Sequence, residues 1–131
     1  MKSLPNFIKE SMSRKYQLSY DTLDCDRHFS GNYDEARRYI LCVLANTPLK
    51  HISSYCASTI ILDYDNEEPR LFKYIRENLS SYFYYSISLV SKTSDNNHVI
   101  NHHPNTHLDT SIKREFKELT CNNLGKDITN Y

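Results

Sequence analysis

The sequence predicts a mainly α-helical protein, a compact bundle of four to five helices. Three observations support this prediction. Apolar residues recur at spacings of three and four over most of the chain, which is typical of amphipathic helices. Several of these stretches begin with a residue that caps helices well. The chain of 131 residues also has only two glycines, whereas sheets with tight hairpins usually contain more.

The length suits a single domain over residues 1–131. Within it, residues 91–107 shift to Ser, Asp, Asn and His without periodicity, which predicts a polar loop. The tail from about residue 122 follows helix-ending Asn and Gly residues, and we expect it to fray.

The first segments are a short predicted helix, an extended stretch and a loop. Residues 4–15 carry an apolar side at helical spacing. Residues 16–20 alternate apolar and polar side chains, which indicates a brief strand or an extended linker. Residues 21–30 are polar and acidic, and we expect a loop there.

Two helices are predicted next. Residues 32–46 begin with Asn32, and Glu35 follows three positions later in a capping-box arrangement. Residues 48–62 begin with Pro48 after a Thr cap and continue with apolar residues at helical spacing. The end of this segment is β-branched enough for a strand, but no Gly, Pro or Asn interrupts it, so we favour a helix.

The stretch of residues 66–90 is the predicted centre of the fold. Asn66 is placed to cap a helix, and Pro69 falls where proline is tolerated in its first turn. Apolar and polar residues alternate over its second half, which also fits a strand. We favour one helix with a break near Ser80 and Ser81. A last helix is expected over residues 108–119, with Ile112 facing the core. The alternative fold is α+β, with strands near residues 16–20, 58–63 and 82–91.

Composition excludes several classes of protein. The chain has 16 basic and 16 acidic residues, which argues against a nucleic-acid binder that relies on overall positive charge. Its longest weakly polar run is far shorter than the roughly 20 residues that span a bilayer, and the N-terminus lacks the apolar run of a signal peptide. No cysteine pair has zinc-ribbon or thioredoxin spacing, so we expect free thiols and a cytoplasmic protein.

The sequence offers little chemistry, and we predict no catalytic residues, no cofactor and no metal. Histidines gather at His98, His102, His103 and His107, and imidazoles four apart can share a metal on a helix. This cluster leaves one alternative open, a small metal-dependent hydrolase or nuclease. A solvated polar loop is the favoured interpretation, because the segment is a poor helix and lacks a metalloprotease motif.

Acidic residues concentrate in two stretches near the predicted helix starts. If those two helices run parallel, both groups lie at one end of the bundle and form a negative patch suited to a basic protein surface. The alternative is that they serve only as favourable charges at helix N-termini. The predicted partner-binding residues are Asp21, Asp24, Asp26, Asp34, Glu35, Asp63, Tyr64, Asp65, Glu67 and Glu68.

A family resemblance follows from the order of these segments. Residues 33–40 read Tyr-Asp-Glu-Ala-Arg-Arg-Tyr-Ile, a segment started by Thr-Pro comes next, and residues 67–75 read Glu-Glu-Pro-Arg-Leu-Phe-Lys-Tyr-Ile. Over residues 16–85 this order resembles the small α-helical immunity proteins of bacterial contact-dependent growth inhibition systems. The resemblance implies a cytosolic, non-enzymatic inhibitor, or antitoxin, that binds and blocks a cognate toxin such as a nuclease. An adaptor or viral interaction domain is the other alternative.

Overall fold

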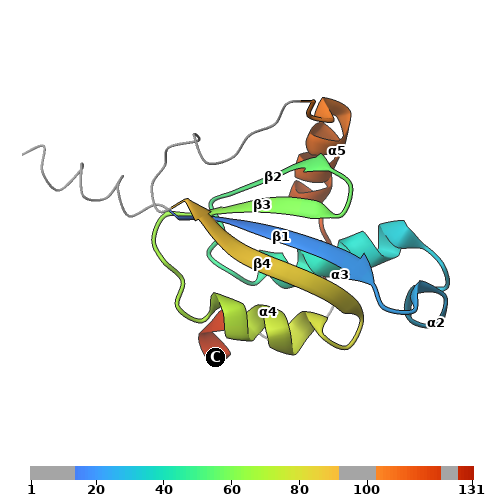
Figure 1. Ribbon diagram of the computed structural model, residues 1–131, viewed down its shortest axis with the longest axis horizontal. Helices are drawn as coiled ribbons and strands as arrows, with labels where there is room; N and C mark the ends of the chain where they lie inside the picture. The colour runs from blue at the N-terminus through green and yellow to red at the C-terminus, as the bar shows by residue number, and fades with distance from the viewer. Residues whose placement is uncertain (1–13, 92–102, 122–126) are drawn as a thin grey trace, which may run out of the picture.

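The computed structural model describes residues 14–91, 103–121 and 127–131, and these form an α+β fold (Figure 1). The predicted mainly α-helical bundle is therefore wrong, and the α+β alternative is the fold class that the chain adopts. In chain order the elements are β1 (Arg14–Thr22), α2 (Cys25–Phe29), α3 (Tyr33–Ala45), β2 (His51–Cys56), β3 (Thr59–Tyr64), α4 (Leu71–Leu79), β4 (Phe83–Ser91), α5 (Thr106–Lys117) and a 3₁₀ turn, η1 (Ile128–Asn130).

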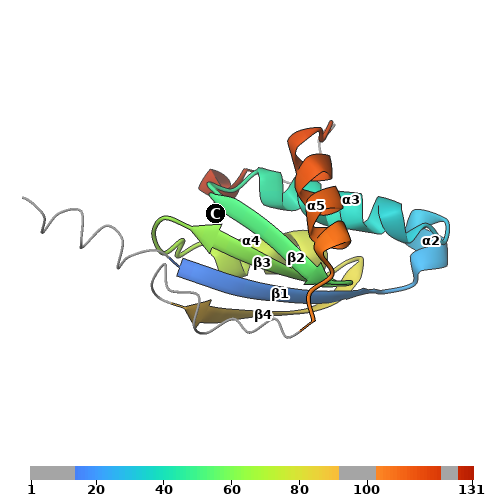
Figure 2. The same cartoon turned by 90° about the horizontal axis from the view of Figure 1, so that it is seen from above.

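The four strands form one antiparallel sheet in the order β2-β3-β1-β4. Helices α3 and α4 lie against one face of the sheet, and α5 lies beside β2 (Figure 1, Figure 2). No described helix covers the opposite face. The strand predicted at residues 16–20 is the middle of β1, and it extends by two residues at each end.

The core lies between the helices and the covered face of the sheet. Alternate strand residues point into it, because successive side chains of a strand face opposite sides. On β1 these are Tyr16 and Leu18, and on β3 they are Ile60, Leu62 and Tyr64. The helices contribute Ala36, Ile40, Leu41, Val43, Leu44, Leu71, Tyr74, Ile75, Leu79 and Ile112.

The predicted helix over residues 48–62 is wrong, because this segment forms the β2–β3 hairpin. Apolar residues four apart suit either a helix or one face of a strand, since four is a multiple of the strand period. Ile52, Cys56 and Ile60 follow one another at this spacing, and Ile52 and Ile60 point into the core. The turn between the strands contains no glycine. Ser58 instead takes the left-handed conformation, with φ at 65°.

The single helix predicted over residues 66–90 is also wrong, because the segment divides into α4 and β4. Asn66 and Pro69 precede the helix, whose N-terminal flanking residue, Arg70, makes no capping side-chain hydrogen bond. The break does fall at Ser80, as predicted. The alternating second half becomes β4, which pairs with β1 along its length.

Two helix predictions are confirmed. Helix α3 begins after Asn32, whose side chain accepts hydrogen bonds from the backbone N–H groups of Asp34 and Glu35. The last helix, α5, starts two residues earlier than expected, because Asn105 caps it. The helix predicted over residues 4–15 lies almost entirely outside the described residues, and its last two residues begin β1.

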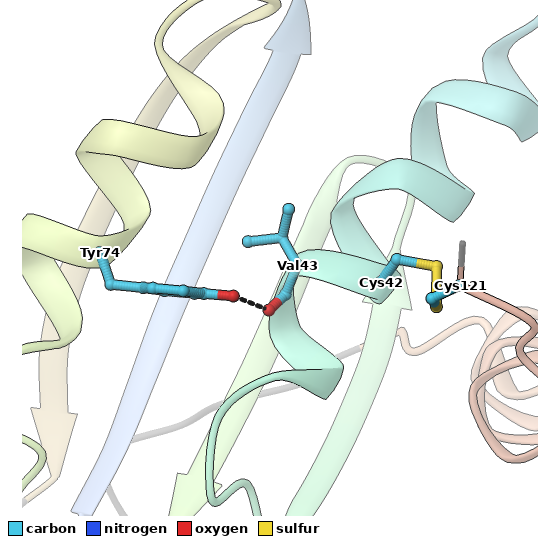
Figure 3. Close-up of a disulfide and its surroundings, with 4 residues drawn as sticks. All are labelled: Cys42, Val43, Tyr74 and Cys121. Carbon is cyan, nitrogen blue, oxygen red and sulfur yellow. Dashed lines mark hydrogen bonds between the residues drawn. A yellow bond between two sulfur atoms is a disulfide. The ribbon is translucent and has the colours of Figure 1, made fainter. Parts of the chain in front are cut away.

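Helix α3 is fixed to its neighbours on both sides (Figure 3). On one side Cys42 forms a disulfide with Cys121, with the two Cα atoms 5.6 Å apart. On the other side the hydroxyl of Tyr74 in α4 donates a hydrogen bond to the carbonyl oxygen of Val43. The expectation of free thiols is therefore wrong for Cys42 and Cys121, while Cys25 and Cys56 are free.

The described end of the tail packs against the core. Ile128 is buried, and the ring of Tyr131 lies edge-on to that of Tyr74 at 5.3 Å. The side-chain amide of Asn78 donates a hydrogen bond to the hydroxyl of Tyr131. Among the described residues, no helix is long and apolar enough to cross a membrane.

Candidate protein-binding site

The two predicted acidic groups lie at opposite ends of the sheet. Tyr64 pairs with Arg14 at the start of β1, whereas Asp21 lies near its end. These ends are roughly 20–25 Å apart at the usual rise of a strand. Figure 1 shows the same separation, with α2 at one end of the molecule and the connection from β3 to α4 at the other. The structure therefore does not combine the two groups into one patch.

The group at the α4 end mostly serves local structure. Asp63 bonds to Lys15 at 2.9 Å, and Glu68, which is only 8% exposed, bonds to Arg70 at 2.8 Å. The hydrogen bonds from Arg70 hold the pKa of Glu68 below its usual value. Asp65 pairs with Lys50 at 3.2 Å, whereas Glu67 is exposed.

Tyr64 belongs to the same group, and its side chain is buried. Its hydroxyl lies 2.9 Å from that of Thr47, which itself donates to the carbonyl oxygen of Leu44, so Tyr64 is the donor to Thr47. Burial raises the pKa of Tyr64 far above its usual value. A residue held in this way contributes to the core and offers no surface to a partner.

The other group is exposed, and we call it the acidic end. Asp34 and Glu35 each pair with an arginine one turn along α3. Within the described part of the chain, the remaining three carboxylates form no salt bridge. The acidic end comprises Asp21, Asp24, Asp26, Asp34 and Glu35, all of them exposed.

Local backbone geometry holds the acidic end in place. Asp24 has φ at 60°, and its side chain accepts a hydrogen bond from the N–H of Arg27 at the start of α2. Gly31 has φ at 75°, and a Cβ there would lie 2.9 Å from the carboxylate of Asp26. Any larger residue at this position would displace that carboxylate.

A pocket of about 210 Å³ opens beside the acidic end. Four segments build it, since the end of β1, the start of α3, the hairpin turn and the start of α5 meet there. Tyr33 on its rim is 66% exposed. The backbone N–H of Tyr20 donates to the carbonyl oxygen of Ser58, which joins the turn to β1 at 2.9 Å. The lining residues that matter below are Tyr20, Asp21, Tyr33, Arg37, Ser58 and Leu108.

Arg37 is the cation of this pocket and is half-buried. Its guanidinium bonds to Glu115 of α5 at 3.1 Å and to Asp34 at 3.5 Å. Its Nε atom is buried and has no hydrogen-bond acceptor among the described residues. Most buried polar groups have a hydrogen-bond partner, so this donor is an exception within the described part of the chain.

Tyr20 forms an uncharged wall of the pocket. Burial raises the pKa of its hydroxyl, and the nearby Arg37 cation partly opposes that increase. The pocket therefore presents aromatic surface, one carboxylate from Asp21 and one compensated arginine. A protein side chain with an apolar stem and a cationic end suits this combination.

The described residues of the pocket contain no nucleophile with an adjacent base. Cys25 is buried within α2, and the ring of His28 packs against Tyr82 at 4.8 Å. Two residues of the predicted histidine cluster, His98 and His102, lie outside the described residues, whereas His103 and His107 are exposed. In the described part of the chain, no three His, Cys, Asp or Glu residues are grouped to hold a metal.

Sequence reasoning located the acidic residues but missed the pocket. Arg37, Ser58 and Leu108 come from three separate segments, and none of them carries a motif. They meet only because the hairpin and α5 fold over the end of β1. Because the sequence predicts a helix over residues 48–62, it predicts neither the hairpin nor the pocket that the hairpin turn helps to form.

Comparison of this chain with protein-family models, with curated proteins and with solved structures finds no match.

Proposed function

We propose that this protein is a non-enzymatic inhibitor of the immunity-protein type, which neutralises a cognate toxin by binding to it through the acidic end. The observation that carries the proposal is the position of exposed Tyr33 and a pocket beside three unpaired carboxylates. Tyrosine rings beside several charges of one sign are typical of surfaces that bind a protein of the opposite charge.

The partner that suits this site is a basic protein domain, such as a nuclease that binds anionic nucleic acid. A lysine or arginine of the partner would enter the pocket along Tyr33 and approach Asp21. Asp24 and Asp26 would add long-range attraction, which speeds association at low salt.

The product of the neighbouring gene is the first partner to test. We expect the two purified proteins to form a stable complex on size-exclusion chromatography and the inhibitor gene to protect cells that express its neighbour. Tyr33→Ala removes an exposed ring and should weaken the complex by about tenfold, the effect typical of an interface hot spot. If no complex forms and no protection is seen, the proposal fails.

The cytoplasm is the compartment that this proposal implies, because the resemblance is to cytosolic inhibitors. Cytosolic thiols are kept reduced, so the pair Cys42 and Cys121 would exist there mainly as a dithiol. Alkylation in intact cells, followed by counting of the labelled cysteines, tests this point. We expect all four cysteines to be labelled once the protein is unfolded. Two cysteines that resist labelling would instead place the protein in an oxidising compartment.

A further inference from the structure

The two edge strands of the sheet, β2 and β4, differ in whether their outer backbone groups are covered. At β2 the edge is covered, because α5 and the residues before it supply hydrogen-bond partners. The backbone N–H of Asn105 donates to the carbonyl oxygen of Tyr55 at 2.9 Å. A carboxylate oxygen of Asp109 accepts from the N–H of Ser54 at 2.8 Å. This edge is therefore closed to another strand.

The other edge, β4, lacks such protection. The strand is nine residues long and pairs with β1 on one side. No described residue bonds to the backbone on its outer side. Its sequence, Phe-Tyr-Tyr-Ser-Ile-Ser-Leu-Val-Ser, contains no charged residue, no proline and no glycine. Natural edge strands usually carry lysine, proline or a bulge that prevents pairing with another chain. In β4 the one irregularity in the pairing with β1 falls at Val90, near the end of the strand, and residues 83–89 pair in regular register.

Apolar side chains along β4 remain partly exposed on the side of the sheet that carries the helices. Leu89 is 39% exposed, and in register it lies opposite Tyr16 of β1. Phe72 of α4, which is 51% exposed, packs edge-on against the same Tyr16 with ring centroids 5.8 Å apart. An unpaired strand edge thus lies next to exposed apolar surface.

We propose that β4 is a homodimerisation strand, which pairs antiparallel with β4 of a second copy about a two-fold axis at Ile87. The two sheets then become one continuous sheet of eight strands. Because the axis is perpendicular to the sheet, the helices of both copies lie on the same side of it.

The strand is complementary to itself in this register. Ile87 is the middle residue of β4 and faces Ile87 of the second copy. Tyr85 faces Leu89 of the second copy, and this aromatic–aliphatic pair occurs twice on the helix side. Ser86 faces Ser88 of the second copy on the open side. A second copy is favoured over a charged peptide because the edge has no charge for such a peptide to meet.

Sedimentation equilibrium of the full chain over micromolar to submillimolar concentrations tests the proposal. We expect a dimer of twice the 15.5 kDa chain mass. The double variant Ser86→Lys/Ser88→Lys places like charges opposite one another across the axis and should halve the observed mass. Gln17→Lys, which adds a charge to the same face on the inner strand β1, should leave the dimer intact. Circular dichroism checks that all variants remain folded.

The register has its own test, made in a Cys56→Ser background so that no exposed native thiol remains. Ile87→Cys should give a disulfide-linked dimer on mild oxidation, because position 87 faces itself across the axis. Leu89→Cys should not, because it faces position 85. A monomer at all concentrations, a dimer that survives the two lysines, or preferential cross-linking at position 89 would overturn the proposal.

Discussion

At the scale of single residues, the least predictable feature is positive φ at turn residues other than glycine. Asp24, Ser30 and Ser58 all have positive φ, between 55° and 65°. For residues with a side chain this conformation is costly, and sequence reasoning expects glycine or asparagine there. The sequence predicts a helix in place of the β2–β3 hairpin, because serine at position 58 does not indicate a turn as glycine or asparagine would.

Ser58→Gly should therefore stabilise the protein. Glycine relieves the left-handed strain at φ 65°, partly offset by its greater freedom in the unfolded chain. We expect the free energy of unfolding to rise by about 0.5 to 1 kcal/mol, measured by urea denaturation. Ala57→Gly, at the neighbouring turn residue without positive φ, is the matched control and should not stabilise. Equal effects at the two positions would contradict this assignment of strain.

At the scale of elements, the cap at Asn32 predicted α3 correctly, whereas three of the four described strands, β2, β3 and β4, were predicted as helix. Asn32 marks α3 correctly because its side chain accepts two backbone N–H groups. In β4, apolar side chains at every second position resemble a continuation of α4, because only Ser80, Ser81 and Tyr82 separate the two elements. The choice between helix and strand there depends on pairing with β1, which lies more than sixty positions away along the chain and leaves no local signal.

The link between α3 and the segment that follows α5 is also an element-scale feature. The disulfide joins residues 79 positions apart and restricts the unfolded chain strongly. Cys121→Ser should lower the free energy of unfolding by about 2 to 4 kcal/mol under oxidising conditions. Reductant should lower the stability of the unmodified protein to that of the variant, while Cys56→Ser, at an exposed free thiol, should change little. Urea denaturation with and without reductant measures this, and stability that does not respond to reductant would contradict it.

At the scale of the whole molecule, the core depends on uncharged tyrosines. Burial raises the pKa of Tyr16, Tyr20, Tyr39, Tyr64 and Tyr74 above the ordinary value of 10.0. A group with a raised folded-state pKa contributes stability that is fully present below the unfolded-state pKa and is lost as pH rises above it.

The protein should therefore lose stability steeply above pH 10. An ultraviolet titration of phenolate, followed in parallel by circular dichroism, makes the measurement. The buried tyrosines should ionise only as secondary structure is lost. Ionisation of all eleven tyrosines with the fold intact would contradict the burial described here.

The two acidic groups lie at opposite ends of the molecule. Among the described residues, only the acidic end combines unpaired carboxylates with an exposed tyrosine and a pocket. Sequence reasoning found the residues of both groups, but their separation depends on the antiparallel pairing of β1 with β3. The order of the predicted helices alone indicates, wrongly, that both acidic groups lie at the same end of the molecule. The proposed function therefore rests on the acidic end, and the β3–α4 end serves as its internal control.

Calorimetric titration of the neighbouring gene's product into matched variants tests this central claim most directly. Asp21→Asn/Asp24→Asn/Asp26→Asn removes the unpaired charges, and asparagine still caps α2 at position 24 and tolerates its positive φ. We predict that this variant binds at least about tenfold more weakly, with a reduced salt dependence. Asp65→Asn/Glu67→Gln at the opposite end should bind like the unmodified protein. Equal binding by all three proteins, or a loss confined to the Asp65→Asn/Glu67→Gln variant, would contradict the account.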